Sequence, residues 1–295
     1  MTAAFGPARW AIEITKVLKQ VFGPAYFPID VIAIAQEYTA QRFPGDAITM
    51  VRGDNLPGFD GALYRAQKGK SGWGIIYNNR VTSPGRINFT IAHELGHYLL
   101  HRAAYPNGIK CGEQDIVRWD SDYAQIEQQA NQFAATLLMP YDDFRRQVEP
   151  RARVDLDILS QCADRYRVSL IAAVLRWLSY TERRAVLVVS REGFILWARS
   201  SEAALKTRAY FRTSGPPIEV PVSSLAAGVD TLIDGRTGVR HAPGIWFPEE
   251  VQEMTLFSER YDFVISLLLL EDQDRYVPLE ELPEEDTYER FTRDL

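Results

Sequence analysis

The chain has only two cysteines in 295 residues, Cys111 and Cys162, and neither lies in the paired spacing of a cysteine metal site. We therefore expect free thiols, as is usual in the cytoplasm. Its longest apolar run, 264–270, is broken by Ser266 and is far shorter than the roughly 20 residues that cross a bilayer. The first residues also lack the basic and apolar segments of a secretory signal. These absences predict a cytoplasmic protein without a membrane span.

Acidic residues slightly outnumber basic ones. The chain has 33 Lys and Arg against 39 Asp and Glu, a net charge of −6, which argues against a protein that coats nucleic acid. Residues 271–295 hold ten acidic and three basic residues, so this tail accounts for the whole negative excess. The apolar content of 46% is typical of a folded globular protein, and the length is sufficient for two domains.

The periodicity of apolar residues predicts an α+β protein. In the first half we expect helices at 28–41, 85–101 and 123–139, and three strands near 47–53, 59–66 and 72–79 that form a small antiparallel sheet. Residues 155–178 are expected to form a helix, a short turn and a second helix. After the charged junction at 182–184, strand-like runs return at 185–190, 193–200 and 261–270, which predicts a separate α+β unit.

The motif HELGH at 93–97 lies in the second of these helices. Two histidines four residues apart on a helix are about 6 Å apart along its axis and slightly more than one turn apart around it. His93 and His97 can therefore hold one zinc ion, while Glu94 faces the water bound to that ion. At about 100° per residue the histidines share one sector, opposite the apolar residues. We therefore expect them to face a cleft and not the core.

A catalytic zinc site needs a third protein ligand and an open position. His101 lies about 12 Å beyond His93 along a straight helix, too far for both to bind one ion with His97. We therefore expect His101 to be a helix-end residue or to hydrogen-bond a metal ligand without binding the metal itself. Glu127 is the preferred third ligand, because it begins a strongly helical segment whose small neighbours Ala130 and Ala134 permit close approach and whose Asn131 could orient a ligand. Four acidic residues in or near a loop are its rivals: Glu113, Asp115, Asp120 and Asp122.

Three passages of the first half resemble the ImmA/IrrE metallopeptidases of bacteria and their mobile elements: PIDVIAIAQEY, INFTIAHELGHYLLH and EQQANQFAATLLMP. The resemblance implies that His93, His97 and Glu127 bind the metal and that Glu94 is the catalytic base. It also implies a substrate, because members of this family cut a helix-turn-helix repressor that silences a mobile element or a DNA-damage response. The chain is thus predicted to be a zinc-dependent, site-specific endopeptidase.

The same resemblance suggests how the domains are arranged. Residues 1–145 are expected to form a zincin-like zinc metallopeptidase domain, 146–183 a helix-turn-helix-like helical segment, and 184–295 a C-terminal α+β domain with an acidic tail. The C-terminal part is similar in element order to the GAF-like sensor of some family members. It is therefore expected to receive a small-molecule or nucleic-acid signal.

Two features of catalysis stay open at this level. The donor that stabilises the oxyanion is expected among Tyr123, Tyr141 and His101. The strand at 72–79 is either an edge strand on which an extended substrate pairs through its backbone or an ordinary core strand.

Two other functions compete with the peptidase. A DNA-binding regulator would use residues 155–178, with Arg165, Arg167 and Arg176 near phosphate, although the second helix is almost wholly apolar and offers few side chains to read bases. An inactive scaffold would have kept only the fold, against which the complete set of His93 and His97 with Glu94 argues.

Overall fold

The structure is a computed structural model, and it describes residues 5–66, 71–112, 121–228, 235–258 and 262–272; the side chains of 110–112 and 121–123 are not described. The chain divides into two compact units. The N-terminal unit holds the described residues of Met1–Tyr141 and Ala163–Ser169, and the C-terminal unit those of Asp142–Cys162 and Leu170–Arg293. The three-part division at 1–145, 146–183 and 184–295 stays a prediction.

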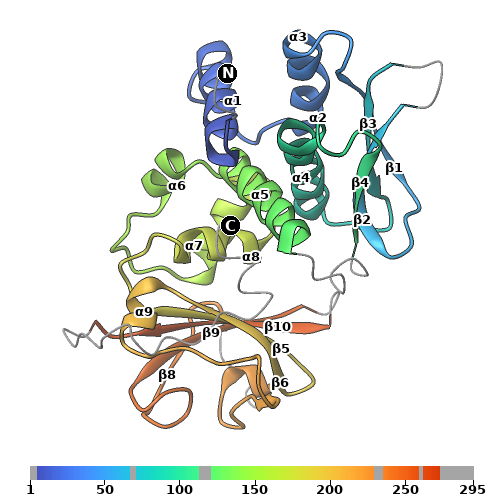
Figure 1. The fold of residues 1–295 in the computed structure, drawn as a ribbon. Helices are drawn as coiled ribbons and strands as arrows, with labels where there is room; N and C mark the ends of the chain where they lie inside the picture. Colours follow the sequence, from blue (N-terminus) through green and yellow to red (C-terminus); the bar gives the residue numbers. More distant parts are fainter. Residues whose placement is uncertain (1–4, 67–70, 113–120, 229–234, 259–261, 273–295) are drawn as a thin grey trace. The chain divides into compact units, whose positions relative to one another are not determined.

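The helices of the N-terminal unit confirm most of the expected segments (Figure 1). They are α1 (Pro7–Phe22), α2 (Val31–Ala33), the π-helical turn η1 (Ile34–Tyr38), α3 (Thr39–Arg42), α4 (Pro84–His101) and α5 (Ser121–Leu138). The helix expected at 28–41 is found as the continuous run α2, η1 and α3, and Asp30 begins it by accepting a hydrogen bond from the backbone of Ala33. Helix α1 was not predicted.

The sheet of this unit is mixed, so the prediction of an antiparallel sheet was wrong. Its strands are β1 (Ile48–Asp54), β2 (Phe59–Arg65), β3 (Trp73–Asn78) and β4 (Gly108–Gly112), in the order β1-β3-β2-β4. Strand β3 pairs antiparallel with β2 but parallel with β1. Turn signals in the sequence favour pairing between successive strands, whereas here β3 inserts between β1 and β2. It is therefore an interior strand, and of the two alternatives left open for 72–79 the core strand is confirmed.

Helix α4 lies between the sheet and α5, and α1 packs on α5 (Figure 1). The helix begins at Ser83, whose hydroxyl accepts a hydrogen bond from the backbone of Arg86, and Pro84 occupies its first turn. The apolar face of α4 packs on the sheet, where Leu95 and Tyr98 are fully buried. Because α5 covers the opposite face, α4 is buried on both sides.

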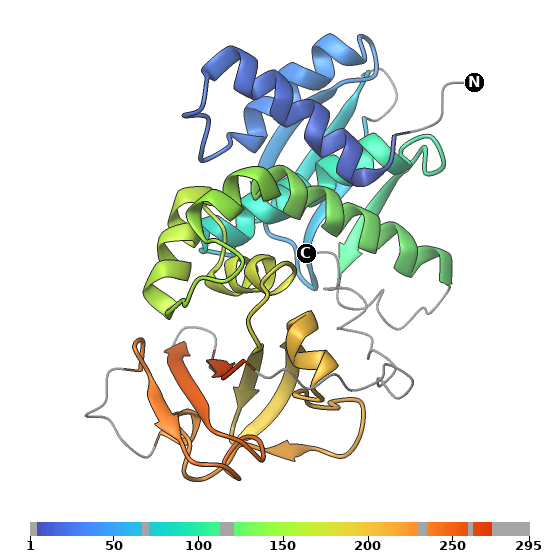
Figure 2. The ribbon, with the colours of Figure 1, turned by 90° about the vertical axis from the view of Figure 1, so that its left-hand side faces the viewer.

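The C-terminal unit is built on a six-stranded antiparallel sheet in the order β7-β6-β5-β10-β9-β8, seen from another side in Figure 2. Its elements are α8 (Leu170–Leu178), β5 (Ala185–Arg191), β6 (Phe194–Ser200), α9 (Glu202–Lys206), β7 (Ile218–Glu219), the 3-10 turn η3 (Leu225–Ala227), β8 (Val239–His241), β9 (Val251–Ser258) and β10 (Phe263–Leu270). A core that includes Val188, Trp246 and Phe247 packs on the sheet. Helix α8 contacts β5 and β6.

Two further helices, α6 (Tyr141–Gln147) and α7 (Leu156–Tyr166), precede α8. The predicted helix pair at 155–178 is thus found as α7 and α8. Most of α8 is buried, and Arg176 is only 1% exposed, which argues against the competing function in which Arg176 lies near a phosphate. A helix buried on its own domain has no face for a DNA groove. Among the described helices, none has the length and apolar character required to cross a membrane.

Candidate metal centre

The two histidines of the HELGH motif converge as their helical spacing predicts. The Nε2 atoms of His93 and His97 are 2.9 Å apart. Both side chains are almost fully buried, at 8% and 0% exposure, because the polar face of α4 is covered by α5. The expectation that this face lines a cleft stays a prediction. The helical period identified the polar sector, but it could not tell that another helix covers it.

Glu127 of α5 completes the cluster. Its Oε2 atom lies 3.1 Å from Nε2 of His93, and its Oε1 atom lies 3.2 Å from Nε2 of His97. One ligand atom from each of the three residues lies within 4.8 Å of the others, an arrangement that could hold a metal ion. The side chains of the rival residues Glu113, Asp115, Asp120 and Asp122 lie outside the described part of the structure.

Small residues at the crossing of α4 and α5 permit this convergence. A Cβ atom added to Gly96 would lie 3.2 Å from Cα of Ala130 and 3.0 Å from the ring of Phe133. Gly96 of α4 and Ala130 of α5 therefore let the two helix backbones approach closely. A larger side chain at either position would move the carboxylate of Glu127 away from the histidines.

Each histidine has a partner on its other ring nitrogen. Nδ1 of His93 lies 2.9 Å from Oδ1 of Asn131, which matches the orienting role expected for this amide. Nδ1 of His97 lies 3.1 Å from Nδ1 of His101, and Nε2 of His101 lies 2.9 Å from Oε1 of Gln129. His101 thus lies outside the cluster of three ligand residues. Gln129 was not singled out in the sequence, where nothing distinguishes it from its neighbours on α5.

Proximity shifts the pKa values of the cluster. Burial lowers the pKa of His93, but the adjacent Glu127 carboxylate outweighs burial and raises that pKa to about 9. Burial also dominates at His97 and lowers its pKa to about 4. Burial would raise the pKa of Glu127, yet the two histidines hold it well below its usual value. Without a metal, the cluster therefore keeps one proton on His93 beside an ionised Glu127.

Glu94 is fully buried next to this cluster, and its charge contributes to the raised pKa of His93. It packs against the backbone of β2 at Gly61. A Cβ atom at that position would lie 2.9 Å from Oε1 of Glu94 and 2.5 Å from Cγ2 of Thr90. Only glycine leaves room for this carboxylate. The sequence offered no sign of the requirement, because the contact joins residues far apart in the chain.

The three expected oxyanion donors have different positions. His101 is buried and hydrogen-bonded within the cluster described above, and Tyr141 is 37% exposed at the start of α6. The side chain of Tyr123 lies outside the described part of the structure. Both ring nitrogens of His101 already have partners, so the predicted donors are Tyr123 and Tyr141.

The C-terminal unit also contains a fully buried carboxylate whose surroundings are of a different kind. Glu253 of β9 is 0% exposed. Its two oxygens accept hydrogen bonds at 2.8–3.0 Å from the backbone of Leu225 and Ala226, from Nε1 of Trp246 and from the hydroxyl of Thr255, and Oε2 lies 2.8 Å from Nε2 of His241. These partners satisfy the charge with donors of the protein itself.

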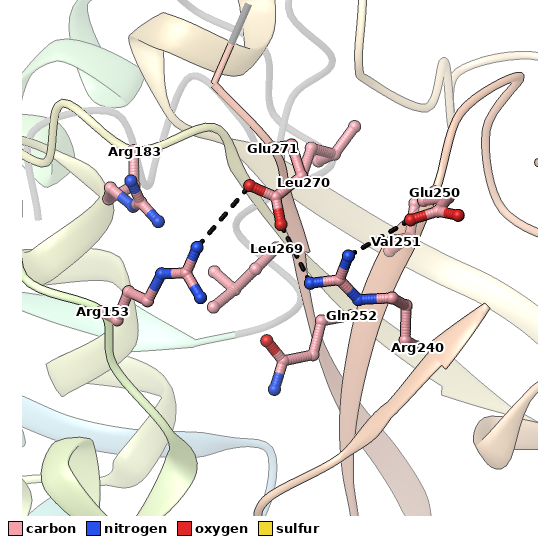
Figure 3. Close-up of a pocket in the computed structure, with 9 residues that line it drawn as sticks. All are labelled: Arg153, Arg183, Arg240, Glu250, Val251, Gln252, Leu269, Leu270 and Glu271. Carbon is pink, nitrogen blue, oxygen red and sulfur yellow. Dashed lines mark hydrogen bonds and ion pairs between the residues drawn. The ribbon is translucent and has the colours of Figure 1, made fainter. Parts of the chain in front are cut away.

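The same unit has a surface pocket lined by arginines and carboxylates (Figure 3). Arg240 pairs with Glu250 at 3.2 Å and with Glu271 at 3.0 Å, while Arg153 lies 3.6 Å from Glu271. All four side chains are more than half exposed. Exposed ion pairs contribute little stability, and the charges here largely compensate one another. We assign this cluster no role in chemistry.

Two histidines four residues apart on one helix and a glutamate from the next helix are compatible with the metal centre of a metallopeptidase. Residues 46–178 match the family model of peptidase M78, described as an IrrE N-terminal-like domain. This stretch is therefore an IrrE N-terminal-like domain, consistent with a metallopeptidase of the ImmA/IrrE family, and the resemblance is confirmed for it. No curated protein gives a significant match to the chain.

Proposed function

We propose that this chain is a zinc-dependent endopeptidase that cuts a helix-turn-helix repressor at one or few sites. The observation that carries the proposal is the convergence of His93, His97 and Glu127, with ligand atoms within 4.8 Å of one another, beside the buried carboxylate of Glu94. The IrrE N-terminal-like domain at 46–178 supports the peptidase activity. The substrate class is supported by the family resemblance.

The donor set fits zinc. Two imidazole nitrogens and one carboxylate are a common ligand set of catalytic zinc, which leaves one coordination position open. The partners on Nδ1 of both histidines agree, because metal-binding histidines usually donate their second N–H to a neighbouring acceptor. When bound there, zinc would lower the pKa of water and polarise the scissile carbonyl.

Glu94 is proposed as the base. It accepts a proton from the attacking water, whose oxygen bonds to the carbonyl carbon, and it passes that proton to the leaving amine as the C–N bond breaks. Its burial between α4 and β2 keeps the carboxylate in one position. The proton therefore leaves the water and reaches the amine through one oriented group.

Selectivity must come from outside this chemistry, because a peptidase in the cytoplasm would otherwise digest its neighbours. We propose that a repressor is recognised by docking, and that the C-terminal sheet unit receives the small-molecule or nucleic-acid signal that controls cleavage. The family match ends at residue 178, before the first strand of this sheet. The regulatory role therefore rests on the resemblance in element order.

The test is cleavage of the helix-turn-helix repressors encoded by neighbouring genes. Purified protein with zinc should convert one of them into two discrete fragments, whereas casein should be cut only slightly. Glu94→Gln should retain zinc and lose cleavage by about 10³-fold, within the range for removal of a general base. Glu13→Gln, an equivalent change in an exposed pair with Lys16, is the matched control and should cleave normally.

Two results would count against the proposal. If Glu94→Gln cuts as fast as the unaltered protein, Glu94 is not the base. If no neighbouring repressor is cut under any stress condition while zinc is bound, the substrate assignment is wrong although the metal centre stands.

A further inference from the structure

A chain of hydrogen bonds leaves the metal centre from the far side of His97. Nδ1 of His97 lies 3.1 Å from Nδ1 of His101, and Nε2 of His101 lies 2.9 Å from Oε1 of Gln129. His97 is fully buried and His101 is 6% exposed. The chain therefore connects α4 with α5 inside the N-terminal unit, and it is separate from the contact between His93 and Asn131.

The positions of the protons along this chain depend on one another. To bind a cation, Nε2 of His97 must have a free lone pair, so the proton of the neutral ring lies on Nδ1. That N–H donates to Nδ1 of His101, which must then be unprotonated. The remaining proton of His101 lies on Nε2 and donates to Oε1 of Gln129. Each hydrogen bond thus fixes the tautomer of the ring before it.

Reversing the amide of Gln129 would reverse every step. Its NH₂ group would donate to Nε2 of His101, and Nδ1 of His101 would carry a proton and donate to Nδ1 of His97. The proton of His97 would then lie on Nε2, which faces His93 at 2.9 Å and Glu127 at 3.2 Å. A protonated nitrogen cannot bind a metal. The carbonyl oxygen of Gln129 faces His101, the orientation that leaves His97 able to bind.

We propose that His101 and Gln129 are positioning residues that set the tautomer of His97 and thereby raise the affinity of the centre for zinc. This inference rests on the proposed function, because it requires that His97 is a metal ligand. It goes further by assigning His97 a support of two residues, where His93 has a single amide. His101 orients His97, and His101 is itself held by a hydrogen bond to Gln129 of α5.

The affinity for zinc tests the assignment through matched substitutions. The amide oxygen of an asparagine can replace Nδ1 of His101 as acceptor, whereas leucine cannot accept. We expect His101→Leu to weaken zinc binding about 10- to 100-fold, as is usual for outer partners of metal ligands, and His101→Asn to stay within about threefold of the unaltered protein. Competition with a chromogenic chelator measures each dissociation constant.

Gln129 gives the complementary pair. A glutamate accepts only, so Gln129→Glu removes the reversed state and should bind zinc about threefold or more tightly, whereas Gln129→Met lacks an acceptor and should bind more weakly. The gain from Gln129→Glu should vanish in the His101→Leu background, because the effect passes through His101. A role in packing alone would not produce this coupling.

The tautomers themselves are measurable. The chain has only four histidines, so long-range ¹H–¹⁵N correlation spectra of the zinc-loaded full chain can be assigned with single variants. We expect the proton of His97 on Nδ1 and that of His101 on Nε2. The tautomers are read in the unaltered chain, so the result does not depend on whether a variant at position 101 folds.

The inference is overturned if His101 carries its proton on Nδ1 in the zinc-loaded protein, or if His101→Leu binds zinc as tightly as the unaltered chain. The proposed function fails in another way. In that case the unaltered chain binds no zinc, or His97→Ala binds zinc as well as the unaltered chain does. The zinc affinities of the variants at positions 101 and 129 would then not report on His97.

Discussion

Glu253 of the sheet unit and Glu127 of the N-terminal unit are both largely withdrawn from solvent, and their charges meet different partners. Glu253 of the sheet unit accepts hydrogen bonds from the backbone, an indole and a hydroxyl, and it faces one imidazole, that of His241. Glu127 of the N-terminal unit instead faces the Nε2 atoms of His93 and His97, two potential metal ligands whose Nδ1 atoms have partners of their own. A carboxylate satisfied by fixed donors stabilises a fold. A carboxylate that faces other potential metal ligands can bind a cation together with them.

The largest expected effect separates the two carboxylates by metal binding. Glu127→Gln should weaken zinc binding by more than about 100-fold, beyond the usual effect of an outer partner, because it removes the charged ligand. Glu253→Gln should bind zinc as the unaltered protein does. Chelator competition on both variants provides the measurement. Equal affinities for zinc would remove the distinction between the two sites.

The free energy of unfolding should be more sensitive to Glu253 than to Glu127, the reverse of the order expected for zinc binding. Glu253→Gln places an amide NH₂ among groups that already donate, so we expect a loss of about 3 kcal/mol in the free energy of unfolding. Urea unfolding of the metal-free protein measures it. A change below about 1 kcal/mol would mean that the donors around Glu253 find other acceptors, and the network would not be the structural element described.

The pH should matter at the metal centre in a defined direction. The pKa of His93 is raised to about 9, so the metal-free protein carries a proton there at neutral pH that a metal must displace. Between about pH 6 and 8 the dissociation constant for zinc should therefore fall about tenfold for each unit of rising pH.

The stability of the metal-free protein should change with pH in the opposite sense. The pair of His93 and Glu127 stabilises the fold fully below the unfolded pKa of the imidazole, 6.5, and this contribution is lost as the pH rises through 9. Zinc titrations and urea unfolding at several pH values measure the two trends. Zinc affinity that is independent of pH would show that His93 is not the protonated group.

The smallest expected effect concerns the position of Glu94. Gly61→Ala introduces a Cβ that would lie 2.9 Å from Oε1 of Glu94, so the carboxylate must move by a few tenths of an ångström or more. We expect cleavage of the repressor to fall about tenfold, with little change in zinc affinity. Gly215→Ala is the control, because a Cβ there meets nothing within 4 Å. If both variants cleave equally well, the packing of Glu94 on β2 is not needed for the reaction.

Local sequence pattern was sufficient for the helices that carry the centre. The apolar period of 85–101 predicted α4, Pro140 marked the end of α5, and the four-residue spacing in HELGH predicted that His93 and His97 converge. Glu127 was chosen because it begins a helical segment and because of the family resemblance, and the helical wheel placed Asn131 beside it. The helices and the histidine pair depend on residues within a few turns of one another, and a sequence reports these contacts directly. The contacts of Glu127 and Asn131 with His93 join two helices, so only the structure shows them.

Tertiary structure alone decided the rest. It placed β3 inside a mixed sheet, buried the polar face of α4 beneath α5, brought Gln129 to His101, and required glycine at position 61. Each of these results joins segments that are distant in sequence. A helical or strand period tells which residues share a face, but the element that covers the face is set by the packing of the whole unit, and that packing decides whether a polar side chain meets water, a donor or a metal ligand.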